Sequence, residues 1–161
     1  MRYFNALWYI VLYCAHPFQY CQVLVNVYYR YLYFFEDGRV MYALTHISPM
    51  EMIPRFSKML LHGYGSKDKW GVWGRYQIKK ETVRVWASQE WTDVCFQLKV
   101  IPSNRVLHYD SGDKGVCTTM KLEEHMTSVS SNFDDDSNDL VRYDLPSGEQ
   151  SYFRFLRDRR L

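Results

Sequence analysis

Cysteine, glycine and proline are sparse in this 161-residue chain. Its four cysteines, Cys14, Cys21, Cys95 and Cys117, are scattered, without a Cys-x-x-Cys pair or a partnered histidine spacing. This pattern excludes a disulfide scaffold and a zinc finger, and it predicts reduced thiols in a cytoplasmic or nuclear protein. Eight glycines and five prolines stand against fourteen tyrosines, and this aromatic excess favours a sheet-rich fold.

An excess of charge of one sign is also missing. Twenty lysines and arginines face eighteen acidic residues, and a net charge of +2 argues against nucleic acid as a partner. Positive charge is nevertheless concentrated in residues 67–86, which hold Lys67, Lys69, Arg75, Lys79, Lys80 and Arg84 against Asp68 and Glu81. This segment predicts a basic face, which is either a solvated sheet surface or a site for an acidic ligand.

No apolar run is long enough to cross a bilayer. The longest candidate, residues 6–15, is rich in tyrosine and tryptophan, and no Ala-x-Ala cleavage site follows it. The chain also lacks an Asn-x-Ser/Thr sequon. We therefore predict neither a membrane span nor secretion, and we treat residues 1–22 as an atypical apolar segment ahead of the main domain.

Catalytic and cofactor motifs are missing too. There is no Gly-x-Ser-x-Gly elbow, phosphate-binding glycine loop or dinucleotide fingerprint. The five histidines are far apart, so we interpret them as surface or capping residues, and His108, which Asp110 follows closely, has no nucleophile near it in sequence. Residues 134–136 are three aspartates without the glycine and distal glutamate of a calcium loop. We predict a protein that is not an enzyme and that has no metal site and no cofactor.

What the chain has in abundance is bulky β-forming side chains. Residues 28–35 are almost entirely aromatic or apolar, Asp37 and Gly38 supply turn residues with positive φ, and residues 39–44 alternate in polarity. The sequence therefore predicts a β-hairpin. Ser48 and Glu51 then form a capping box around Pro49, which predicts a helix that ends after His62 and covers an open end of a sheet.

Short connections separate the remaining strand-like segments. These segments are residues 70–79, 82–89, 91–101, 105–110, 116–122, 140–144 and 151–156, and residues 126–139 form a polar loop. The count predicts a mainly β domain over residues 23–161, with about eight antiparallel strands and one short helix. Because closure removes unpaired edges, we expect a small closed or nearly closed, lipocalin-like barrel. The alternative is an open two-layer α+β sheet.

One segment of the chain has a distinctive amino-acid sequence. Residues 28–38 read Tyr-Tyr-Arg-Tyr-Leu-Tyr-Phe-Phe-Glu-Asp-Gly, followed by Pro49, Pro54 and Arg55, by Gly74-Arg75-Tyr76 and by Tyr152-Phe153-Arg154-Phe155. From about Val23 to the end, the chain resembles the carboxy-terminal domain of the F-box only protein 9 family. The resemblance implies a non-catalytic substrate-recognition domain of a cullin-based ubiquitin ligase. Its partners would be protein substrates, and the ligase adaptor would bind only through an F-box, which this chain lacks.

Tryptophans provide the candidate binding site. Aromatic residues and arginine are enriched at interaction hot spots, and we predict a protein-binding site at Trp73, Arg84, Trp86 and Trp91. The alternative is that these aromatic rings belong to the core. A second candidate function is a carrier of a small apolar ligand inside the barrel, which would need a hollow interior.

Overall fold

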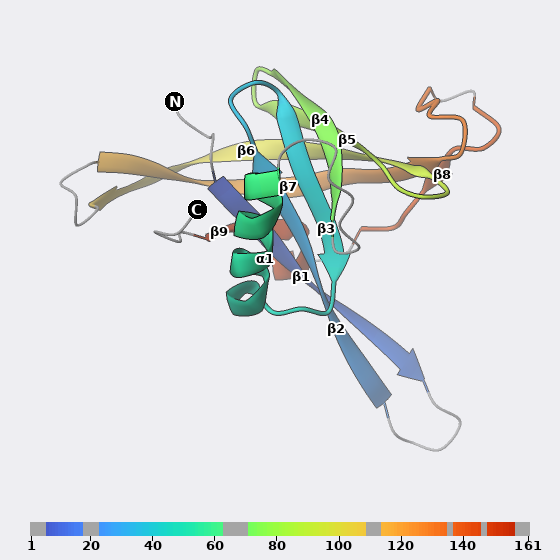
Figure 1. Ribbon diagram of the computed structural model, residues 1–161, viewed down its shortest axis with the longest axis horizontal. Coiled ribbons are helices and arrows are strands. Elements are labelled where there is room, and N and C mark those ends of the chain that lie inside the picture. Colours follow the sequence, from blue (N-terminus) through green and yellow to red (C-terminus); the bar gives the residue numbers. More distant parts are fainter. Residues whose placement is uncertain are drawn as a thin grey trace.

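Strands dominate the protein (Figure 1). The computed structural model describes residues 6–17, 23–62, 71–108, 114–134, 137–145 and 148–156, without the side chains of residues 6–26, 102–118, 149 and 154–156. The elements are β1 Ala6–Pro17, β2 Val23–Phe34, β3 Arg39–Thr45, α1 Pro49–His62, β4 Val72–Lys79, β5 Thr82–Ser88, β6 Asp93–His108, β7 Lys114–Ser128, β8 Val141–Arg142, the 3-10 helix η1 Gly148–Ser151 and β9 Tyr152–Leu156. The mainly β prediction with one α-helix is confirmed for these residues.

The strands form one strongly curled, antiparallel sheet. Eight strands follow one another around a strongly curled half-barrel in the order β6-β5-β4-β3-β2-β1-β9-β7. The first and last strands of this order, β6 and β7, also pair with each other. The closing strand β9 is short, with three residue pairs to β1 and two to β7. The two-residue strand β8 pairs with β7 beyond β9. This arrangement confirms the nearly closed barrel.

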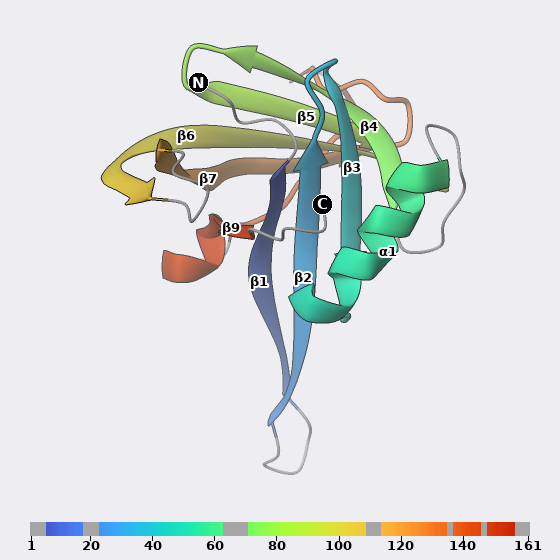
Figure 2. The same ribbon diagram turned by 60° about the vertical axis from the view of Figure 1, so that its left-hand side comes forward.

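Part of the N-terminal segment belongs to the sheet, where we had placed residues 1–22 outside the main domain. Strand β1 pairs with β2 over twelve residues, from Ala6 opposite Phe34 to Pro17 opposite Val23. The β1–β2 hairpin projects well beyond the rest of the sheet (Figures 1 and 2). Residues 1–5 and 18–22 lie outside the described residues. On its other side, β1 pairs with β9 at Leu7, Trp8 and Tyr9.

The interior of the half-barrel is filled with alternate side chains of six strands. Its buried residues are Leu32, Phe34, Val40, Tyr42, Val83, Val85, Ala87, Val94, Phe96, Leu98, Val100, Met120, Leu122 and Phe153. The rings of Tyr42 and Phe96, from β3 and β6, meet with centroids 5.1 Å apart. The period of two predicted for β5 and β6 is therefore confirmed, since every second residue faces this core.

Helix α1 covers the outer face of β2 and β3 (Figure 2), whereas we had predicted that it covers an open end of the sheet. Tyr31, Tyr33 and Met41 point outward from these strands and are buried beneath the helix. Because an apolar outer face needs burial as much as the inner one, the helix packs there. The hydroxyl of Tyr31 donates to the carbonyl of Ile47, at 2.7 Å, in the connection that leads to the helix. Among the described residues, no helix has the length and apolar character to span a membrane.

The capping box at the start of α1 differs in detail from the predicted one. The carboxylate of Glu51 accepts hydrogen bonds from the amide of Ser48, at 3.4 Å, and from its hydroxyl, at 3.0 Å. The amides of Glu51 and Met52 donate to the carbonyl of Ser48 at 3.1 and 2.9 Å. The helix ends at His62, as predicted.

The β2–β3 turn uses one positive φ, where two were predicted. Gly38 has φ +87°, whereas Asp37 does not have a positive φ. The amide of Phe35 donates to the carbonyl of Arg39, at 2.9 Å, and that of Gly38 donates to Phe35 at 3.3 Å. Such a turn needs left-handed backbone only at its glycine. Asp37 instead accepts from the Arg39 amide at 3.1 Å and pairs with its guanidinium at 2.6 Å.

Three predictions for the C-terminal half also differ from the structure. Residues 102–104 lie inside β6 and do not form the predicted turn, because β7 pairs with Pro102 and again with Val106, with an irregularity between these two residues. Strand β7 extends through Ser128, so the polar loop starts at Val129 and not at Met126, which is buried. The predicted strand 140–144 is reduced to Val141–Arg142.

Candidate functional site

The outer face of β4, β5 and β6 carries polar side chains in register. Arg84 lies directly opposite Gln77 on one side and Gln97 on the other. In the next row, Thr82 lies between Lys79 and Lys99. Val83 and Val85 point into the core. Because side chains alternate along a strand, Thr82 and Arg84 and the residues paired with them point outward. The sheet thus presents two short polar rows on its outer surface.

A groove of about 770 Å³ lies over these rows. It is lined by Gln77, Lys79, Lys80, Glu81, Thr82, Arg84, Gln97, Lys99 and Glu123. Four of these residues are cationic and two are acidic. None of the four cations forms an ion pair with a carboxylate of the described residues. The groove is therefore positively charged, and the basic face that the sequence predicts extends across β4 and β5 to Lys99 of β6.

The β4–β5 turn forms one rim of the groove. Lys80 adopts a left-handed backbone conformation with φ 58°. For residues other than glycine, this conformation costs about 1–2 kcal/mol of free energy. The carbonyl of Glu81 accepts a hydrogen bond from the amide of Val100, at 2.7 Å, and this bond ties the turn to β6. The two charged side chains of the turn are therefore held at a fixed edge of the groove.

Arg84 is the half-buried cation of the groove. Its guanidinium carbon lies 5.7 Å from the centre of the Trp86 ring, and its Nε is buried without a hydrogen-bond partner among the described residues. Arg84 also lies beside the fully buried Cys95. Burial raises the pKa of the Cys95 thiol, and the nearby guanidinium offsets part of that rise. Contact with the Trp86 ring orients the guanidinium and leaves hydrogen-bonding capacity unused.

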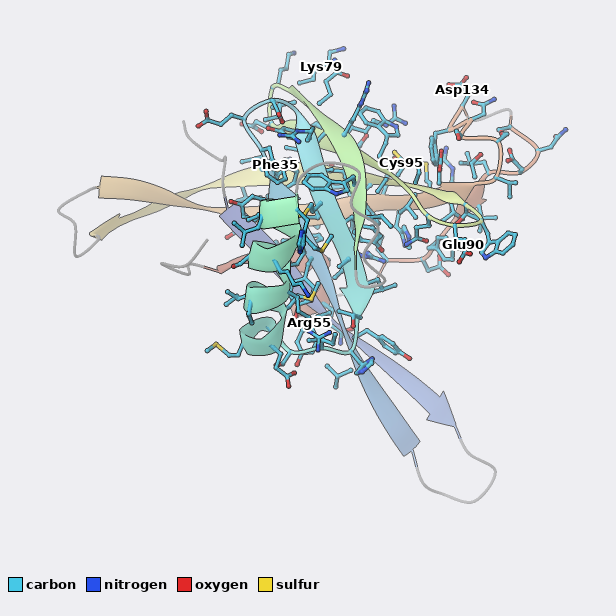
Figure 3. All side chains as sticks on the ribbon, in the orientation of Figure 1. Phe35, Arg55, Lys79, Glu90, Cys95 and Asp134 are labelled. Atoms are coloured by element: carbon cyan, nitrogen blue, oxygen red, sulfur yellow. The ribbon has the colours of Figure 1, made fainter. Side chains whose placement is uncertain are left out.

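Of the four predicted binding residues, the structure brings two together. Arg84 and Trp86 are in contact on the outer face of β5. Trp73 is half-buried and packs on Phe35, with ring centroids 5.3 Å apart, as part of the cluster beneath α1. Trp91 lies in the β5–β6 turn and is 80% exposed. Figure 3 shows Glu90, its neighbour, at the opposite end of β5 from Lys79.

A second polar arrangement lies inside the half-barrel. Arg30 of β2, only 4% exposed, reaches across to β6 and β7. Its guanidinium lies 4.7 Å from the ring centre of Phe96, and its Nη2 lies 3.4 Å from Nδ1 of His125. The ring of His125 stacks on Tyr143, with centroids 4.4 Å apart. We had interpreted the lone histidines as surface or capping residues, and for His125 this was wrong.

Burial, together with the nearby Arg30 charge, lowers the pKa of His125 from 6.5 to about 3. The imidazole is therefore neutral at physiological pH and can accept a hydrogen bond from Arg30 at Nδ1. Burial also raises the pKa of the Tyr42 hydroxyl, which neighbours Arg30. The arrangement links opposite walls of the barrel. Its members are separated by 95 residues in sequence, so no local pattern could reveal it.

The acidic loop after β7 is organised by Asp139. Its carboxylate accepts from the hydroxyls of Ser128, Ser130 and Ser137 at 3.0, 3.0 and 2.5 Å, and from the Ser130 amide at 2.6 Å. These bonds, first that of Ser137, hold the pKa of Asp139 well below its usual range. Of the three aspartates at residues 134–136, Asp134 is exposed, and the other two lie outside the described residues.

Comparisons of the chain with protein-family models, with curated proteins and with solved structures found no match.

Proposed function

We propose that the protein is a non-catalytic protein-interaction module, which binds target proteins on the outer face of β4–β6. The observation that carries this proposal is the combination of Arg84 and Trp86, in contact beside a groove whose cations pair with no carboxylate in the described part of the chain. Aromatic residues and arginine dominate binding energy at protein interfaces. Arg84 lines the groove, so that its guanidinium can donate hydrogen bonds to acceptors of a partner.

The alternative function, a carrier of a small apolar ligand, receives less support. A carrier needs an enclosed apolar cavity of several hundred Å³. The interior here is occupied by Tyr42, Phe96 and Phe153, all buried, and by Arg30, which brings a charge into the same space. Bulky rings that meet across the barrel leave little room for a ligand.

The resemblance to the F-box only protein 9 family extends the proposal. On this reading, the protein is the substrate-recognition part of a cullin-based ubiquitin ligase in the cytoplasm or nucleus. Protein substrates would bind directly, and the ligase adaptor would bind only through an F-box supplied ahead of this domain. Neither nucleic acid nor a membrane is a proposed partner, and no cofactor is involved.

Peptide selection tests the binding function. Random dodecapeptides displayed on phage are selected on the immobilised whole chain, and binding is then compared in Arg84→Gln and Trp86→Ala variants. We expect selected peptides to lose binding to both variants and to retain it in Leu61→Ala, a matched control on the exposed side of α1. Circular dichroism checks that each variant is folded. Saturable uptake of an apolar fluorescent dye without any selected peptide would support the carrier instead.

A fusion tests the ligase role. A helical F-box segment is placed ahead of the whole chain, and a reporter protein carries a selected peptide. We expect the adaptor to bind the fusion but not the chain alone, and we expect the reconstituted ligase to ubiquitylate the reporter. Adaptor binding without ubiquitylation of a reporter that binds the fusion would contradict the ligase role, while the peptide-binding function would stand.

A further inference from the structure

We infer that the groove over β4–β6 binds an acidic peptide segment of the target protein, an inference that rests on the proposed function and specifies its ligand. The groove volume, about 770 Å³, falls within the range of ligand-binding clefts. What distinguishes it is the concentration of positive charge that no carboxylate of the described residues pairs with.

Like charges face each other across the sheet at the groove edge. Lys99 of β6 lies directly opposite Lys121 of β7, and Lys79 lies two strands away in the same row. Lysines directly opposite each other in a sheet destabilise it. None of the three forms an ion pair with a described carboxylate. An anionic ligand placed along this row would relieve the repulsion.

Arg84 provides a directional contact on the groove floor. A guanidinium matches a carboxylate in a paired, two-bond geometry, whereas an ammonium acts as a point charge. Gln77 and Gln97 flank Arg84 in register, and their side-chain amides can donate further hydrogen bonds to carboxylate or carbonyl oxygens. A segment with several carboxylates would therefore meet the half-buried Arg84 and the exposed lysines around it.

The same features favour a peptide over a nucleic acid. Glu81 and Glu123 also line the groove, and a nucleic-acid strand, with a phosphate at every nucleotide, would bring charge against them. A peptide can place uncharged residues there. Added β-strand pairing is excluded for this face, because β5 already pairs with β4 and β6 along its length. Recognition therefore depends on side chains and charge.

Nuclear magnetic resonance titration of the whole chain tests the inference. The probes are octaglutamate, octaglutamine and the octamer of deoxythymidylate. We expect octaglutamate to shift the amide signals of Gln77, Arg84 and Gln97, and octaglutamine to leave them unchanged. Affinity for octaglutamate should fall about tenfold between low and near-physiological salt, because screening weakens exposed ion pairs.

Two variants remove a cation without damaging the sheet. Lys80→Gly places glycine where φ is 58°, so its stability should equal or exceed that of the parent while octaglutamate binds about two- to fivefold more weakly. Lys99→Gln should weaken binding by a similar factor. Lys58→Gln, at an exposed position of α1, is the matched control and should leave affinity unchanged.

Equal shifts with octaglutamate and octaglutamine, shifts confined to other strands, or tighter binding of the oligonucleotide would each overturn the inference. Failure of the inference can be told apart from failure of the proposed function. If the selection yields uncharged peptides that require Trp86 but not Lys80 or Lys99, the protein-binding function stands and the acidic specificity falls. If it yields no peptide and octaglutamate does not bind, both fall.

Discussion

The half-buried His125 should make the stability of the protein begin to fall at about pH 6.5, above the range where most carboxylates titrate. In the folded protein its pKa is about 3, while an unfolded histidine has a pKa of 6.5. Above pH 6.5, neither state binds the proton. As pH falls below 6.5, the unfolded chain binds a proton that the folded protein does not bind until about pH 3. The free energy of unfolding therefore falls with falling pH across this window.

The size of this effect follows from the shift. Each pH unit within the window removes at most roughly 1.36 kcal/mol, so that two units, from pH 6.5 to about 4.5, remove at most about 2.7 kcal/mol. That is a large share of the 5–15 kcal/mol typical of small domains. The physical cause is that an imidazolium would lie inside the barrel beside the Arg30 guanidinium, 3.4 Å from Nδ1.

Urea unfolding at pH 7, 6 and 5 measures the effect in the parent and in His125→Gln. Glutamine does not titrate, and its oxygen can accept a hydrogen bond from Arg30. We expect the variant to be less stable at pH 7, since it loses the stacking on Tyr143, but to show a shallower dependence on pH. Identical slopes in the two proteins would refute the assignment. In Arg30→Met, the pKa of His125 should rise but stay below 6.5, because burial is the larger cause.

Three further predictions concern the fold. Gly74→Ala should lower the free energy of unfolding by about 1–3 kcal/mol in thermal or urea unfolding, because the added Cβ would overlap the carbonyl oxygen of Trp86; an unchanged midpoint would contradict this close approach. Asp139→Ala should speed amide hydrogen exchange at Ser130, because the Asp139 carboxylate accepts a hydrogen bond from this amide, and it should change the global melting temperature little. Unchanged exchange would show that the loop does not depend on this carboxylate. Deletion of residues 1–17 removes β1 and exposes edges of β2 and β9, so light scattering should detect aggregation; a monomeric, cooperatively folding product would show that β1 is dispensable.

Local alternation predicts much of this fold from sequence. In β6, Val94, Phe96 and Leu98 face the core, while Gln97 and Lys99 face outward, as the period of two requires. Period two also assigns Arg84 to the outer face. The groove itself joins residues of β4, β5 and β6, so it depends on the register between strands, which periodicity within a strand does not contain.

Three of the errors of prediction share one physical origin, which is dependence on distant partners. Residues 102–104 look like a turn until β7 is seen to pair past them. The segment 6–17 looks atypical until β9, from the other end of the chain, lies beside it. His125 looks isolated until Arg30 reaches it across the barrel. Long-range pairing of this kind overrides local signals.

The outer surface of the sheet divides into two parts with different physical explanations. Over β2 and β3, the outward side chains are apolar, and α1 buries them, so packing explains their identity. Over the part of β4–β6 that carries the groove, most outward side chains are polar and at least partly exposed, so folding places little demand on the sign of their charge. A surface that served only solubility would intersperse both signs. In the groove, four cations stand against two glutamates, and none of the four pairs with a carboxylate of the described residues; the proposed recognition of an acidic partner would account for this excess.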